Sequence, residues 1–110
     1  MNFIEIIKQS AEKSIIYTLH SLDEMNAEDE LITTDEVRSA VFNGEIIEDY
    51  PEDKRGHSCL MFGTPNNRRP VHVVCAPKDE YLAIITAYIP SLEKWEADLR
   101  HGGKNEMPVM

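Results

Sequence analysis

Several side chains in this sequence are of the types that bind and cleave a phosphodiester. Cleavage of RNA without a metal needs a base near the ribose 2′-hydroxyl, an acid near the leaving oxygen and fixed cations at the phosphate. Histidine titrates near neutral pH and can act as base or acid, and a guanidinium binds phosphate oxygens in a bidentate way. The candidates of these types are His20, Lys54, Arg55, His57, Arg68, Arg69 and His72.

These candidates also have ordinary structural interpretations. His20 and Glu24 are four residues apart, so they can form a simple surface pair, or Glu24 can orient the imidazole. Arg68 and Arg69 also fit a solvated turn, and His72 also fits a half-buried strand position. Both interpretations therefore stay open for each residue.

Other kinds of functional site find little support in the sequence. There is no G-x-S-x-G motif, P-loop or dinucleotide fingerprint among the five glycines. Cys59 and Cys75 each lie inside a predicted strand, which favours buried thiols over a disulfide or a metal site. No CxxC or His-x-His spacing offers a set of metal ligands. We therefore expect neither a metal nor any other cofactor.

The charge is unevenly distributed along the chain. The net charge is −9, but residues 1–53 carry 14 acidic and 3 basic side chains, a net of −11, whereas residues 54–110 carry 6 acidic and 8 basic ones, a net of +2. Phosphate backbones are bound by Lys and Arg, so the acidic half argues against RNA binding there. This half can be a docking face for a basic partner or an ordinary solvated surface.

The first half of the chain has helical patterns. Apolar residues recur largely at three- and four-residue spacings from Phe3 to Met25, which predicts a long helix. The polar stretch 8–14 interrupts this stripe, so the first turns can form a separate short helix, and 26–30 is an acidic loop. Thr33 and Glu36 form a capping box for another helix, which ends at Asn43-Gly44 with a left-handed residue.

The second half of the chain changes to an extended pattern. Segments 45–50, 58–62, 71–76 and 81–88 are rich in strand-forming residues, and their separators are too short for crossover helices. His72 shares a strand face with Val74 and Ala76, the less apolar face, where a working site would lie. Tyr88, which closes the last strand, can hydrogen-bond a phosphate or fill the sheet edge. Ser91 then caps a short helix carrying Leu92, Trp95 and Leu99.

The elements together predict the α+β class, with N-terminal helices packed on an antiparallel meander of about four strands and a short C-terminal helix. We expect a single domain over 1–110, with an ordered core at about 3–100 and a loose tail at 102–110. No stretch approaches the roughly 20 apolar residues of a membrane span. Glu5 interrupts the N-terminal apolar patch where a signal peptide would be uninterrupted, so we expect a cytoplasmic protein without membrane contact.

Five sequence segments carry a resemblance to a known family. They are Leu19–Met25 (LHSLDEM), Ile32–Val37 (ITTDEV), Asn43–Pro51 (NGEIIEDYP), Arg69–Val74 (RPVHVV) and Ile84–Pro90 (IITAYIP), followed by Trp95. In this order they resemble the bacterial domain-of-unknown-function family numbered forty-two fifty-eight over about residues 17–96. That family is distantly similar to the RelE and BrnT ribonuclease toxins and is often encoded near a zinc-finger antitoxin.

The resemblance implies a toxin-type, metal-independent endoribonuclease with RNA and a zinc-finger antitoxin as partners. It places the family's recurrent helix histidine at His20, its basic strand start at Arg69 with His72 following, and its strand-end motif at Thr86 and Tyr88. The residues predicted for catalysis are therefore His20, Arg69, His72 and Tyr88. Those predicted for substrate binding are Lys54, Arg55, His57, Arg68 and Thr86.

One departure from the family pattern keeps a second interpretation open. Family members often carry arginines after the helix histidine, whereas this chain has Asp23, Glu24 and Glu28 there. An acidic helix is poorly suited to RNA. The alternative is a non-catalytic interaction module, a degenerate toxin-like domain whose acidic helices dock a basic partner. The oligomeric state is not readable from these patterns.

Overall fold

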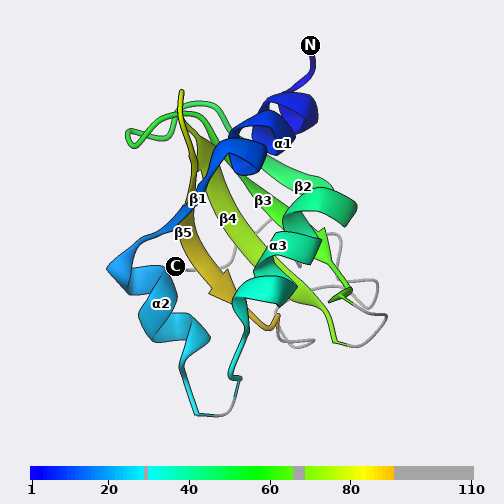
Figure 1. The fold of residues 1–110 in the computed structure, drawn as a ribbon, viewed down its shortest axis with the longest axis vertical. Helices are drawn as coiled ribbons and strands as arrows, with labels where there is room; N and C mark the ends of the chain where they lie inside the picture. The colour runs from blue at the N-terminus through cyan, green and yellow to red at the C-terminus, as the bar shows by residue number, and fades with distance from the viewer. Residues whose placement is uncertain (29, 66–68, 91–110) are drawn as a thin grey trace.

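The structure is a computed structural model that describes residues 1–28, 30–65 and 69–90. These residues form three helices and five strands, shown in Figure 1. The elements are, in order, α1 (Phe3–Lys13), β1 (Ile15–Tyr17), α2 (Leu19–Met25), α3 (Thr34–Asn43), β2 (Glu45–Tyr50), β3 (Ser58–Gly63), β4 (Val71–Pro77) and β5 (Leu82–Tyr88). The predicted α+β class is confirmed.

The sheet differs from the predicted four-stranded meander. Its strand order is β1-β5-β4-β3-β2, in which β2 to β5 form the antiparallel meander and β1 adds a parallel strand beside β5. The described sheet is therefore mixed and has five strands. The predicted C-terminal helix from Ser91 and the tail lie outside the described residues.

The extra strand corrects the prediction of one long helix from Phe3 to Met25 and confirms the alternative in which the first turns form a separate helix. α1 ends at Lys13, and Ser14 adopts an extended conformation that starts β1. The Leu82 N–H donates to the Ser14 carbonyl at 2.8 Å, and the Thr18 N–H donates to the Ile84 carbonyl at 3.1 Å. Pairing with β5 therefore fixes 15–17 as a strand, and Thr18 then caps α2 by accepting from the Ser21 N–H.

The capping box predicted for α3 is confirmed. The Thr33 hydroxyl accepts from the Glu36 N–H at 3.1 Å, and the Glu36 carboxylate accepts from the Thr33 N–H at 3.0 Å. These two bonds satisfy donors that have no partner within the helix. The start of α3 is thus determined by local sequence.

The end of α3 has another cause than the one predicted. Gly44 has φ −88°, so it is not the left-handed residue expected there. A Cβ at Gly44 would instead collide with the carbonyl oxygens of Ala40 and Phe62. Glycine is required because two backbone segments approach each other closely at this point.

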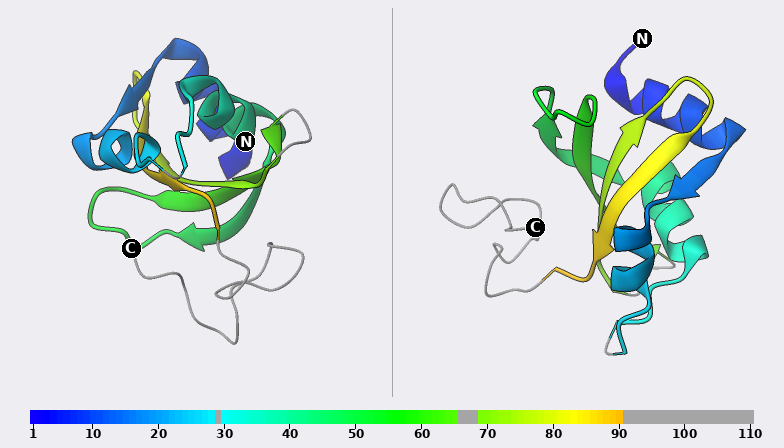
Figure 2. Two further views of the ribbon diagram at one scale, coloured as in Figure 1. Left: turned by 90° about the horizontal axis from the view of Figure 1, so that it is seen from below. Right: turned by 90° about the vertical axis from the view of Figure 1, so that its left-hand side faces the viewer.

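The two faces of the sheet have different surroundings. All three helices pack on one face, which we call the first face, as Figure 2 shows. The opposite, second face carries a smaller apolar cluster that includes Leu60, Val74 and Ile85, and no helix of the described ranges lies over it. Cys59 and Cys75 are free, buried thiols on the first face, as predicted. None of the described helices is long and apolar enough to cross a membrane.

Candidate active site

Two of the predicted catalytic residues meet on the second face. His72 of β4 and Tyr88 of β5 are directly opposite in the antiparallel register. The Tyr88 hydroxyl oxygen lies 3.3 Å from His72 Nδ1, and the two rings meet edge to face with centroids 5.3 Å apart. His72 is fully buried, whereas Tyr88 is half-buried. The pairing of neighbouring strands therefore joins an imidazole to a phenol that lies closer to solvent.

A second polar pair, which sequence reasoning missed, lies on the same face. The Tyr50 hydroxyl donates to Glu48 Oε1 at 3.0 Å, and both residues belong to β2. Burial raises the pKa of Tyr88, and the negative charge of Glu48 raises it further. Burial and the hydrogen bond to Glu48 also raise the pKa of Tyr50. Both phenols therefore keep their protons at neutral pH and can act as hydrogen-bond donors.

A β-bulge accounts for the position of Glu48. Ile46 pairs with Met61 and Glu48 pairs with Leu60, so Ile47 is an extra residue in β2. The extra residue shifts the alternation of side chains, and Glu48 reaches the second face together with Leu60.

Thr86 also lies on the second face. It pairs with Val74 of β4, two positions along β5 from Tyr88, and it is 2% exposed. A side chain this well buried is poorly placed to bind a substrate directly. The substrate-binding role of Thr86 stays a prediction.

Arg69 does not join the His72–Tyr88 pair. Its guanidinium binds the Glu36 carboxylate of α3, with donor–acceptor distances of 3.1 Å from Nε and 3.0 Å from Nη2, and Nη2 also donates to the Leu31 carbonyl. The hydrogen bond from Arg69 lowers the pKa of Glu36. Arg69 therefore connects α3 and the loop before it to the start of β4. The neighbouring Arg68 lies outside the described residues.

We predict that Arg69→Ala makes the domain less stable in a pH-dependent way. Because the pKa of Glu36 is lower in the folded protein, the pair stabilises the fold above the ordinary glutamate pKa of about 4.3. This contribution is lost as the pH falls through the lower, folded pKa. Arg69 is partly exposed, so we expect a loss of about 1 kcal/mol near pH 7.

Urea unfolding at several pH values measures this effect, with the exposed Lys54→Ala as a control that removes the same charge. The difference between Arg69→Ala and wild type should shrink in acid. A loss of stability that is equally large at pH 7 and well below pH 4 would contradict the ion-pair explanation.

The cations of the β2–β3 turn lie at the opposite end of the sheet from Arg69. Arg55 binds Asp53 through Nε and Nη2 at 3.0 and 2.8 Å, and this interaction lowers the pKa of Asp53. His57 Nε2 is 2.5 Å from Asp49 Oδ1, and its ring stacks on Phe3 of α1 at a centroid distance of 3.8 Å. Lys54, the third predicted substrate-binding cation of this turn, is exposed.

His20 lies on the other side of the sheet from His72. It is the second residue of α2, which packs against β5 on the first face, and its Nε2 is 3.5 Å from Glu24 Oε1. Glu24 also accepts from the Ala87 N–H at 3.3 Å, and burial raises the pKa of Glu24. The predicted His20–Glu24 pair is present, but the two candidate histidines do not face a common substrate.

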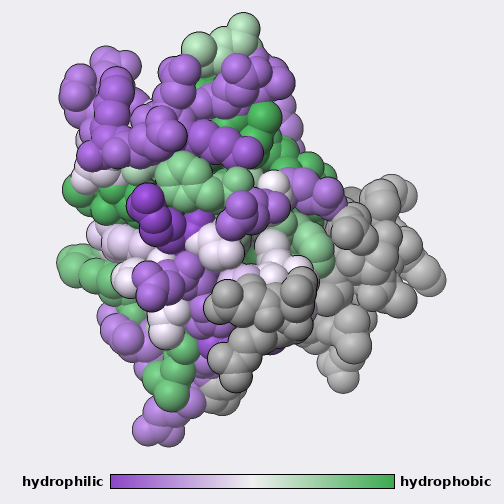
Figure 3. All heavy atoms as spheres, turned by 45° about the vertical axis from the view of Figure 1, so that its right-hand side comes forward, coloured by the Kyte–Doolittle hydropathy of each residue, from purple (hydrophilic) through white to green (hydrophobic). Residues whose placement is uncertain are grey.

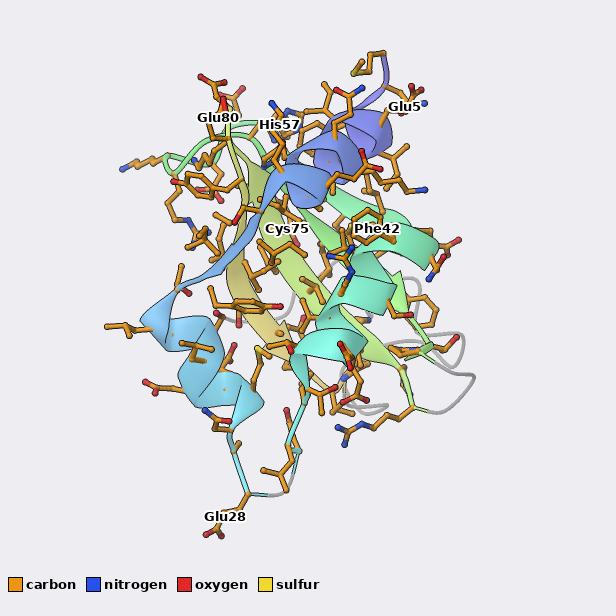
Figure 4. All side chains as sticks on the ribbon, viewed as in Figure 1. Glu5, Glu28, Phe42, His57, Cys75 and Glu80 are labelled. Carbon is orange, nitrogen blue, oxygen red and sulfur yellow. The ribbon has the colours of Figure 1, made fainter. Side chains whose placement is uncertain are left out.

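Acidic side chains of the described residues lie at both ends of the molecule. Figure 4 places His57 and Glu80 at one end of the molecule and Glu28 at the other. On the side seen in Figure 3, hydrophilic residues gather towards the top of the view, and apolar residues lie between and below them. Three of the described candidates, His72, Thr86 and Tyr88, lie on the second face of the sheet. Three others, His20, Arg69 and His57, lie on the helix side.

Comparison with known proteins identifies one family. The model of a family described as "Domain of unknown function (DUF4258)" matches residues 17–89. The match covers every described element except α1 and the first residues of β1. No curated protein and no solved structure matches this chain.

Proposed function

The chain belongs to the DUF4258 family, and because this family resembles toxin-type ribonucleases, we propose that the chain is a metal-independent endoribonuclease with its site on the second face. The observation that carries this proposal is the 3.3 Å contact between His72 Nδ1 and the Tyr88 hydroxyl. Histidine and tyrosine are both able to transfer protons. The domain would act in the cytoplasm on RNA and be held in check by a zinc-finger antitoxin.

The proposed reaction assigns different roles to the second-face residues. Tyr88 is closer to solvent than His72, so its hydroxyl is the group that meets the RNA. Its raised pKa keeps the hydroxyl protonated at neutral pH, so it can give up a proton as negative charge develops on the leaving 5′-oxygen, and His72 returns a proton to it. The Glu48 carboxylate, held by Tyr50, is the chemical type that accepts the proton of the attacking 2′-hydroxyl.

The proposal is tested with purified protein and a short single-stranded RNA in the presence of a chelator. We expect cleavage that continues without divalent metal and leaves a 2′,3′-cyclic phosphate, because the ribose hydroxyl is the nucleophile. Induction of the wild-type gene in a bacterial host should also arrest growth with decay of total RNA. Intact RNA after prolonged incubation with folded protein would overturn the proposal.

A second candidate, the non-catalytic interaction module, is favoured by the engagement of the cations. Arg55, Arg69 and His57 each face a carboxylate of the same chain, which leaves these groups less available to phosphate. Under this reading the acidic helices dock a basic protein partner, and no histidine is needed for chemistry. Unimpaired growth and intact RNA with soluble, folded protein would favour this candidate.

A further inference from the structure

The two cysteines lie directly opposite each other in neighbouring strands. Cys59 of β3 and Cys75 of β4 are register partners in the antiparallel pair, and both thiols are free and fully buried. Directly opposed residues in antiparallel strands have Cα atoms about 4.5 to 5.5 Å apart. Disulfides span Cα distances of about 4.4 to 6.8 Å, so the backbone already holds the cysteines within bonding range.

We propose that Cys59 and Cys75 are a redox modification site that forms a reversible cross-strand disulfide with a low-molecular-weight disulfide as oxidant. One cysteine thiolate attacks a sulfur of the oxidant and releases one small thiol, which leaves a mixed disulfide. The second cysteine thiolate then attacks the protein sulfur and displaces the second small thiol. The two cysteines are oxidised, the small disulfide is reduced to two thiols, and the proton of each cysteine thiol passes through solvent to a released thiolate.

Helix α1 controls access to this site. Both cysteines belong to the first-face core that includes Ile7 and Ala11 of α1, and Figure 4 shows Cys75 within the sheet. The hydrogen bond with the adjacent Cys59 thiol and burial raise the pKa of Cys75, so little of the reactive thiolate is present while α1 packs on the sheet. Exchange therefore requires α1 to move away from the sheet.

Two kinds of contact hold α1 against the sheet. At its start, the Phe3 ring stacks on His57 of the β2–β3 turn with an interplanar angle of 8°. At its end, the Ser10 hydroxyl donates to the Lys78 carbonyl at 3.0 Å, and Lys13 Nζ donates to the Asp79 carbonyl at 2.8 Å. Weakening the aromatic stack should let α1 move away from the sheet more often without altering either cysteine.

The experiment incubates folded wild-type protein with oxidised glutathione and counts free thiols after quenching in acid and denaturing. We expect slow loss of both thiols together, a mass lower by two hydrogens, and no disulfide-linked dimer on a non-reducing gel. The oxidised protein should unfold at a higher urea concentration than the reduced one. Phe3→Ala should speed thiol loss by roughly fivefold, whereas the exposed Glu12→Ala on the same helix should not change the rate.

Several results would overturn the proposal. Two free thiols after long incubation, or one glutathione adduct per chain that never resolves, would show that the sulfurs cannot bond. Should Phe3→Ala fail to fold, Phe3→Leu removes the aromatic stack while keeping an apolar side chain, and the same rate comparison applies. Equal rates for Phe3→Leu and wild type would refute control of access by α1.

Discussion

Replacement of Gly44 by alanine is expected to destabilise the domain by about 3 kcal/mol or more, at the upper end of the range for overpacking a well-filled site. The added Cβ would collide with the carbonyl oxygens of Ala40 and Phe62, which are backbone atoms of α3 and β3. Neither can move alone, because the Gly44 N–H donates to the Ala40 carbonyl at 2.9 Å and Phe62 belongs to the sheet. Urea unfolding of the purified variant measures the loss.

The other glycines provide controls of graded severity. A Cβ at Gly63 would lie 2.7 Å from the Ala40 Cα, another backbone clash, so Gly63→Ala should also be strongly destabilising. At Gly56, with φ 110°, the nearest atom is the flexible Lys78 Nζ, and the cost should be mainly conformational, at about 1 to 2 kcal/mol. If Gly44→Ala were no more destabilising than Gly56→Ala, close backbone approach would not explain the end of α3.

Elements fixed by neighbouring residues could be predicted from the sequence. The capping box at Thr33 and Glu36 depends on atoms three residues apart, and the strands of the meander are separated by short turns with strong signals. The His20–Glu24 pair likewise follows from helical spacing. In each case the interacting groups are close in the sequence, so spacing alone determines the contact.

Elements fixed by distant residues could not be predicted in this way. The segment Ile15–Tyr17 continues the apolar spacing of a helix, and only its parallel pairing with β5, far along the chain, makes it a strand. The extra residue Ile47 inverts the face of Glu48, although simple alternation gives no warning of it. Long-range pairing and a bulge thus account for the errors in the sheet.

The residues of the predicted site lie on two sides of the sheet, and contacts between distant residues explain this as well. His72 and Tyr88 share the second face because Ile85 is an extra residue in β5, which shifts the alternation of side chains before Thr86 and Tyr88. Arg69 carried the correct charge for phosphate, but its partner Glu36 lies on a helix whose packing the sequence does not reveal. Residue type therefore indicated the chemistry, and tertiary packing decided which residues remain available for it.

Under the proposed ribonuclease function, Tyr88→Phe is expected to lower the rate of RNA cleavage by about 10² to 10⁴, the usual contribution of a positioned acid or base. This substitution keeps the half-buried ring and removes only the hydroxyl that lies beside His72. His72→Asn should lower the rate as well, because His72 acts through Tyr88. Single-turnover cleavage of one RNA at a series of pH values measures both effects.

His20→Ala is the matched control, because it removes a histidine from the helix side of the sheet. His20 is exposed and contacts Glu24 rather than the second face, so its removal should change the cleavage rate by less than about threefold. A loss as large as that of Tyr88→Phe would instead place the chemistry at α2, and would favour the family's helix histidine over the strand pair. Equal activity of Tyr88→Phe and wild type would likewise remove the second face from the reaction, because the Tyr88 hydroxyl is the group proposed to meet the RNA.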